Sequence, residues 1–189
     1  MRIKRLAAVC VCVVGLLGGL FGFASPSWAY LQEDVDMLLE NNECPVCILT
    51  EAPLSGASLY QANLKVAEMP GANLTNADLR ETNLMLAELK NADFSGADLS
   101  GAEMNGARLQ EATLSQANLS GVVLTQANMD EADLQGANQT DADLTAAVIG
   151  TADMRGADLS GANLRGANWS QAIMCNTIMP DGRINDRNC

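Results

Sequence analysis

The chain of 189 residues contains no histidine, and aromatic residues make up 4% of it. Histidine is the most common general base and metal ligand near neutral pH, so its absence removes the usual acid–base and metal chemistries. Basic residues are also scarce, with 11 lysines and arginines against 23 acidic residues. So negative a surface repels nucleic acid and anionic lipid. We therefore expect no catalytic residue, cofactor or metal, and neither nucleic acid nor membrane as a partner.

One long apolar run is present, and it lies at the start of the chain. It spans residues 6–24, follows three basic residues and precedes Ser27 and Ala29 at the small-x-small positions of a cleavage site. These features predict a secretory signal peptide, residues 1–29, cleaved after Ala29. The alternative is an uncleaved membrane anchor, but four glycines within the run favour cleavage. The remaining 160 residues would carry a net charge of −15.

From Leu54 to Met179 a large position recurs every five residues without an insertion. Of these 26 positions, sixteen hold Leu, six hold Met, and the others hold Phe, Ile, Trp and Gln139. Alanine stands two places earlier in 23 of the 26 cases. The chain is therefore a repeat array, which we place at residues 48–179.

A period of five excludes both an α-helix and a straight strand. Five helical residues advance about 500°, so successive large residues would share no face. In a straight strand an odd period would send every second large residue to the opposite side. A chain that bends once per repeat keeps the small and the large residue inside. Four bends close a square of about twenty residues, and squares stack ~4.8 Å apart through backbone hydrogen bonds.

The repeats, as in ANLTNADLRETNL and ADLSGANLRGANW, resemble those of the pentapeptide-repeat proteins over residues 49–179. This resemblance implies an all-β fold, the right-handed quadrilateral β-helix, and the hand comes from the resemblance alone. Open ends of such a solenoid need caps. We expect an N-terminal helical cap at residues 30–47, helical over residues 33–42, and a C-terminal cap at residues 180–189.

Four cysteines lie beyond the expected signal peptide, and an even number in an exported chain indicates disulfides. Cys44 and Cys47 precede the repeats, whereas Cys175 and Cys189 end them, so the rod separates the two pairs. This separation excludes a site with four cysteine ligands. We expect Cys175–Cys189 to close the C-terminal cap and Cys44–Cys47 to form a structural pair. The CPVC spacing is also that of thiol oxidoreductases, so a thiol-redox protein using Cys44 and Cys47 is an alternative.

Three polar or aromatic features within the repeats are candidate sites. Gln139 is polar at a large position, so its amide must bond to inward backbone or mark a local distortion. Asp78, Asp98 and Asp158 share one wall of the square and could form a ladder for a cation, but two asparagines interrupt it. A solvated acidic wall is expected instead. Trp169 is expected to pack in the core.

One wall of the square is less polar than the others. Val66, Met85, Leu86 and Val123 project outward from it on several coils. Exposed apolar residues taken singly are ordinary on protein surfaces. As a hypothesis, this wall faces a protein partner of unknown identity.

These features predict a non-enzymatic, exported rod that acts as a scaffold or protein-interaction module. The signal peptide, the CPVC and the MPDG…C end are similar to exported pentapeptide-repeat proteins of cyanobacteria, which implies the periplasm or the thylakoid lumen. An alternative is a DNA mimic that interacts with gyrase, as in family members that resemble duplex DNA in width and charge. The signal peptide argues against this alternative because gyrase is cytoplasmic.

Overall fold

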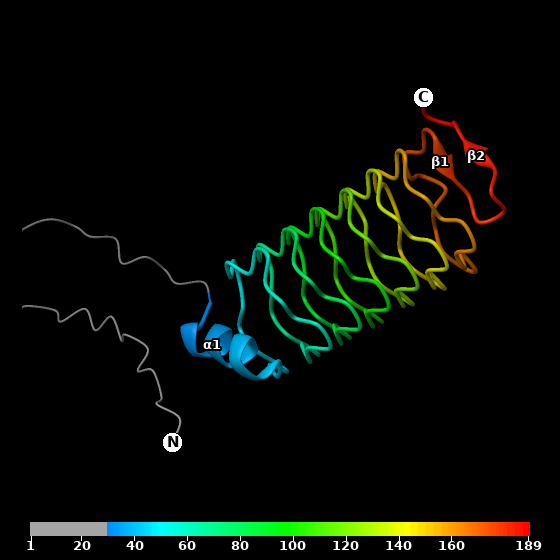
Figure 1. Ribbon diagram of the computed structural model, residues 1–189. Coiled ribbons are helices and arrows are strands. Elements are labelled where there is room, and N and C mark those ends of the chain that lie inside the picture. Colours follow the sequence, from blue (N-terminus) through cyan, green and yellow to red (C-terminus); the bar gives the residue numbers. More distant parts are fainter. Residues whose placement is uncertain (1–29) are drawn as a thin grey trace, which may run out of the picture.

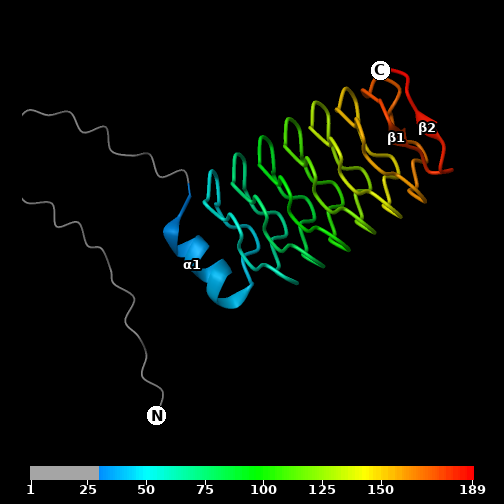
Figure 2. The same ribbon diagram turned by 45° about the horizontal axis from the view of Figure 1, so that its top comes forward.

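The computed structural model describes residues 30–189, so the expected signal peptide lies outside the described residues. The chain forms a narrow rod of stacked coils (Figures 1 and 2). Helix α1, Gln32–Asn41, covers one end, and the strands β1, Thr177–Ile178, and β2, Ile184–Asn185, lie at the other. No helix among residues 30–189 is long and apolar enough to cross a membrane.

Each coil contains twenty residues and stacks on the next through parallel backbone bridges. Asp78 bridges to Asp98, for example, and this register runs from Glu43 to Ile178. Each wall contributes one bridging residue, so the pairing is a ladder of single bridges rather than a sheet of long strands. The arrangement is the four-sided coil expected from a period of five.

Three hydrogen bonds per wall join one coil to the next. The N–H of Leu64 donates to the Asn83 carbonyl at 2.8 Å, and the N–H of Val66 donates to the Met85 carbonyl at 2.9 Å. The N–H of Asn83 donates back to the Ala62 carbonyl at 2.9 Å. Because each coil satisfies its neighbour in this way, only the first and last coils need other partners.

The small and large positions of the repeats form one continuous core. From Leu49 to Leu159 every residue at these positions is buried except Ala57, which is partly exposed. Each buried leucine contributes roughly 1.5–3 kcal/mol. Corners are made by the fifth residue of most repeats in a left-handed conformation, such as Gly56 at φ 65° and Val66 at φ 60°. Glycine adopts this conformation at little cost, whereas a β-branched residue is strained there.

Helix α1 closes the first coil, and its Val35 and Leu38 are buried. It begins and ends one residue earlier than expected. It ends at Asn41 because Asn42 takes the left-handed C-cap conformation and donates its N–H to the Leu38 carbonyl at 2.9 Å. Stacking also starts earlier than residue 48, because Glu43 already bridges to Asn63. The CPVC segment is therefore part of the first coil rather than of the helical cap.

The register is interrupted once, between Val148 and Asn168. The side-chain carbonyl of Asn168 accepts the N–H groups of Ile149 at 2.7 Å and Gly150 at 3.1 Å. The backbone bonds at this point are longer, from the Asn168 N–H to the Ala147 carbonyl at 3.2 Å and from the Gly150 N–H to the Asn168 carbonyl at 3.3 Å. Gly150 makes its left-handed corner one position earlier than other repeats do. Trp169 follows on the displaced wall and packs against the core as expected, but it is only partly buried. Within residues 30–189, no further coil covers this wall.

Candidate functional site

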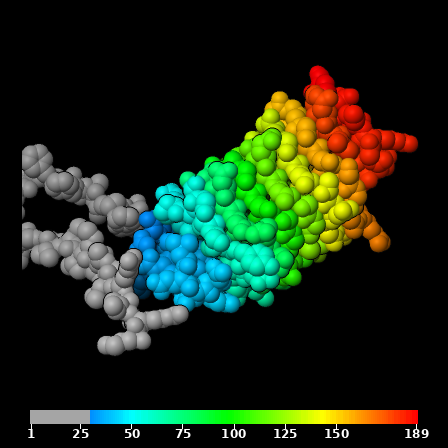
Figure 3. Space-filling view, viewed as in Figure 1, coloured from blue at the N-terminus to red at the C-terminus, as the bar shows by residue number. Residues whose placement is uncertain are grey.

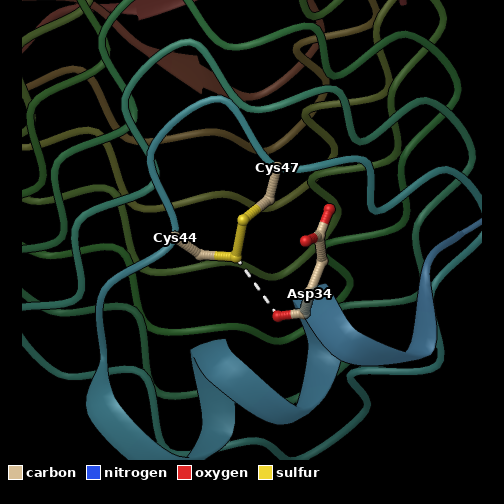
Figure 4. A group of neighbouring side chains, drawn as sticks. All are labelled: Asp34, Cys44 and Cys47. Atoms are coloured by element: carbon tan, nitrogen blue, oxygen red, sulfur yellow. Dashed lines mark hydrogen bonds between the residues drawn. A yellow bond between two sulfur atoms is a disulfide. The ribbon is translucent and has the colours of Figure 1, made fainter.

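Cys44 and Cys47 are joined by a disulfide beneath α1, with their Cα atoms 5.4 Å apart (Figure 4). Cys44 occupies the large position of the first wall and is fully buried, and Cys47 occupies the small position of the next and is 3% exposed. The carbonyl oxygen of Asp34 lies 3.2 Å from Cys44 Sγ, and its carboxylate accepts the Ile48 N–H at 2.7 Å. The sulfurs therefore replace a leucine and an alanine in the core.

This environment does not suit thiol chemistry. Exchange requires an attacking thiolate to reach a sulfur, and both sulfurs are buried. A carboxylate oxygen of Asp34 lies within 4.8 Å of them, and negative charge at this range disfavours a thiolate. Metal binding requires free thiolates, which the disulfide has consumed. Asp34, Cys44 and Cys47 thus form a group around a buried disulfide in the first coil.

Cys175 and Cys189 form a second disulfide, which ties the chain end to the last coil across a sequence separation of 14. Asp186 lies beside it, and its carboxylate accepts the Asn176 N–H at 2.9 Å. Asn188 makes the equivalent contact by accepting the Met174 N–H at 3.0 Å. The disulfide thus holds two side chains where the backbone of a next coil would stand.

A hollow of about 480 Å³ opens at this C-terminal end. Its apolar part is formed by Leu164, Trp169 and Met179, all partly exposed, and by Ile184, which is 63% exposed. The polar rim and remaining lining are Pro180, Asp181, Arg183, Asn185 and Asp186. The Arg187 guanidinium lies 5.9 Å from the centre of the Trp169 ring. This hollow was not anticipated from the sequence, although Trp at a leucine position next to the last coil was a signal for it.

The structure places the expected partner residues on one wall, which we call the Val66 wall and define as residues 62–66, 82–86, 102–106 and 122–126. Val66 and Leu86 occupy successive corners of one column and are 38% and 53% exposed. Gly106 follows in that column, and a Cβ there would stand 2.8 Å from Leu86 Cδ2. Met85 is adjacent, but Val123 is separated from them by Glu103. Three of the four residues thus form a small patch.

The acidic wall is held together by hydrogen bonds. The Asp78 carboxylate accepts a hydrogen bond from Arg80 Nε at 2.7 Å, and the Asp98 carboxylate accepts one from the side-chain amide of Asn118 at 3.0 Å. The amide of Asn138 continues the chain by donating to Asn118 at 3.2 Å. The guanidinium of Arg80 holds the pKa of Asp78 below its ordinary value, chiefly through this hydrogen bond. Carboxylate and amide oxygens of the wall thus accept hydrogen bonds from neighbouring side chains.

Gln139 is fully buried, and neither its side-chain oxygen nor its nitrogen has a hydrogen-bond partner among the described residues. The backbone around it keeps its register, because Asn138 still bridges to both Asn118 and Asp158. Neither expectation for Gln139, a bond to inward backbone or a local distortion, is met. The amide remains an unsatisfied polar group in a leucine column.

The family model described as pentapeptide repeats matches eight copies in residues 47–84, 87–126, 107–145 and 152–183. The matches cover well over half of the chain, which therefore belongs to the pentapeptide-repeat family. Proteins of this family form right-handed β-helices, which agrees with the stacked coils described above.

A similar solved structure is HetL, a pentapeptide repeat protein involved in heterocyst differentiation regulation from the cyanobacterium Nostoc sp. strain PCC 7120. It is 34% identical over 76% of this chain and 74% of its own, with a TM-score of 0.65. A thylakoid-lumen pentapeptide repeat protein from Arabidopsis thaliana is 30% identical over 62% of this chain and 68% of its own, with a TM-score of 0.25. Rfr23 from the cyanobacterium Cyanothece 51142 is 24% identical over 78% of this chain and 97% of its own, with a TM-score of 0.34. A search of curated proteins found no match.

Proposed function

We propose that this chain is an exported, non-enzymatic rod that binds protein partners on its surface. One observation carries the proposal: the chain uses its chemically reactive side chains for structure. The four described cysteines form two disulfides. Outward carboxylates such as Asp78 and Asp98 bond to neighbouring side chains of the walls. What remains for function is a long, rigid, chemically varied surface.

Two disulfides in a small domain support export, because such bonds persist in oxidising compartments and are rare in the cytosol. The periplasm and the thylakoid lumen are the proposed locations, in line with the resemblance to exported cyanobacterial members. HetL also comes from a cyanobacterium. The same disulfides count against the gyrase-interacting DNA mimic, because gyrase is cytoplasmic. Burial of Cys44 and Cys47 counts against the thiol-redox alternative.

The location can be tested by expressing the tagged full chain in a cyanobacterium and labelling its cysteines with a bulky maleimide after denaturation. We expect an N-terminus at Tyr30 and four cysteines that react only after reduction. Chains in the cytoplasmic fraction with reactive cysteines would contradict export.

Partner binding is tested by comparing proteins that co-purify with the wild type and with the Met85→Ser, Leu86→Ser double variant. The control is Ile173→Ser, which changes a residue of similar chemistry, 38% exposed, on another wall. We expect the double variant to lose a partner that the control keeps. Equal recovery by both variants would exclude the Val66 wall as the binding surface.

A further inference from the structure

The C-terminal cap replaces the next coil on only two of the four walls. On one wall, Asn188 and Asp186 side chains accept the N–H groups of Met174 and Asn176. On the next, the N–H of Met179 donates to the Arg183 carbonyl at 2.8 Å within the hairpin of β1 and β2. The cap thus provides acceptors wherever it covers the last coil.

The other two walls of the last coil, residues 162–171, keep backbone N–H groups without acceptors among the described residues, although the Arg187 guanidinium of the cap donates to the Trp169 carbonyl at 3.4 Å. One coil earlier, the N–H groups of Leu144 and Ala146 donate to carbonyls of the following coil at 2.9 Å each. Their counterparts at Leu164 and Gly166 have no hydrogen-bond acceptor among the described residues. The same holds on the next wall for the N–H groups of Trp169 and Gln171. The donors alternate with a spacing of two residues, as along the edge of a sheet.

The hollow lies beside this edge. Leu164 and Trp169 supply two edge donors and also line the hollow, which is partly walled by Ile184 of β2. Figure 3 shows this end of the rod, with the last coil in orange and the cap in red. A strand that paired with the edge would direct its inward large side chain between Leu164, Trp169 and Met179, as each coil does to the one before it.

Charge distinguishes this edge from the rest of the rod. Residues 162–171 include Arg165 and no acidic residue, in a chain with an excess of acidic residues. Arg165 is exposed, and its guanidinium has no acidic partner among the described residues. Elsewhere, charged side chains one coil apart form complementary pairs, such as Arg108 with Glu88. A strand placed on the edge would therefore favour an acidic residue above Arg165.

We infer that residues 162–171 bind an extended peptide segment of a protein partner by strand addition. The segment pairs with the donors of Leu164 and Gly166, places one large apolar side chain in the hollow and carries an acidic residue directly after it. Its pattern is small–x–large apolar–acidic. This inference rests on the proposed function as an interaction rod and names one of its binding sites.

The test uses the peptide acetyl-TATFET-amide, titrated into the isotope-labelled full chain and followed by backbone amide NMR. We expect saturable shifts at Leu164, Gly166, Trp169 and Gln171. A peptide N-methylated at alternate residues cannot pair as a strand, and we expect it to bind at least about tenfold more weakly. Equal binding of both peptides, or shifts spread over the walls of the rod, would overturn the proposal.

Two variants test the side-chain part. Ile184→Glu removes an exposed wall of the hollow, and we expect about tenfold weaker binding, against less than about twofold for the control Ile173→Glu. Arg165→Glu should weaken binding of TATFET but not of TATFQT, which lacks the acid. Equal effects of Ile184→Glu and Ile173→Glu would exclude the hollow as the binding site of the apolar side chain. Loss of TATFQT binding in Arg165→Glu would exclude pairing of Arg165 with the acidic residue of the peptide.

A second copy of the chain is the competing occupant. Without peptide, the signals of the same four amides would then shift as the protein concentration rises, and this shift would disappear in Ile184→Glu. Such a result would identify self-association and overturn the proposal. The interaction rod itself is tested separately on the Val66 wall, so loss of peptide binding with retained partner capture would reject only this site.

Discussion

The two ends of the rod are capped in different ways. At the N-terminal end, α1 lies across the first coil, and both Leu38 of this helix and Cys44 beneath it are completely buried. At the C-terminal end the hairpin lies along part of the last coil, and Leu164 and Trp169 stay partly exposed. A disulfide is present at each end, inside the core at the first and on the exterior at the second. The N-terminal cap thus buries core side chains beneath a helix, whereas the C-terminal cap leaves Leu164 and Trp169 partly exposed.

The comparison shows that the two caps of one stacked β-helix can leave different parts of their end coils exposed. An edge that is fully covered contributes only stability, whereas a free edge with an apolar hollow can bind another strand. The following predictions test whether the two ends differ in this way.

The largest expected effect comes from truncating matched leucines. Leu38→Ala should destabilise the chain by about 2–5 kcal/mol, since it opens a cavity under α1. Leu164→Ala should cost less than half as much, because that side chain is already partly in water. Urea unfolding of both variants measures the difference. Equal losses would mean that the C-terminal end is as closed as the N-terminal end.

Removing each disulfide in turn should affect the end of the rod at which that disulfide lies. On the chain-entropy model, the double variant Cys175→Ala, Cys189→Ala should lose about 3 kcal/mol of unfolding free energy. The double variant Cys44→Ala, Cys47→Ala should lose about 2 kcal/mol, because its disulfide closes a shorter loop. We expect the first pair to accelerate amide exchange at Met174, which depends on the cap for its acceptor. Hydrogen exchange followed by NMR gives the comparison. Unchanged exchange at Met174 would show that the cap holds without its disulfide.

A change in the middle of the rod provides a reference for both ends. Gln139→Leu removes an unsatisfied buried amide, and we expect a gain of about 1–3 kcal/mol. The reverse change in the same column, Leu119→Gln, should destabilise the chain. Thermal unfolding measures both. If Gln139→Leu destabilises, the amide has a partner, such as a buried water, and the column is not purely apolar.

The smallest effect concerns two ion pairs in opposite halves of the rod. Hydrogen bonds from Arg80 and Arg155 hold the pKa of Asp78 and of Asp153 below the unfolded value of 3.8. A lowered folded pKa adds stability above the unfolded pKa, and this stability is lost as pH falls through the folded pKa. Asp153→Asn should therefore destabilise slightly at about pH 7 and less at about pH 2.

Asp78→Asn is the matched control for this pH dependence. The side chain of Asp153 is 18% exposed and that of Asp78 is 32% exposed, so solvent screens the first pair less. We expect the larger pH-dependent difference for Asp153→Asn in urea titrations at the two pH values. A larger effect at Asp78 would show that exposure does not decide the strength of these pairs.

Most of the rod could be predicted from its residues. The alternation of Ala and Leu every five positions is incompatible with other regular backbones, and both cysteine pairings followed from the length of the rod. The candidate surface was predicted less completely, because the patch of Val66, Met85 and Leu86 depends on stacking and excludes Val123. The hollow was missed. Its walls come from Leu164, Trp169 and Ile184, which only the return of the chain after Gly182 brings together.

The sequence by itself determined the period of this protein, because a repeat of small and large residues dictates where the chain must bend. It determined neither the lack of a partner for Gln139 nor the shifted corner at Gly150. Tertiary structure alone decided that a helix buries core side chains at the first coil, whereas Leu164 and Trp169 stay partly exposed at the last. The physical reason is that a cap covers an end through long-range packing and hydrogen bonds, which depend on where the chain turns back rather than on any local pattern.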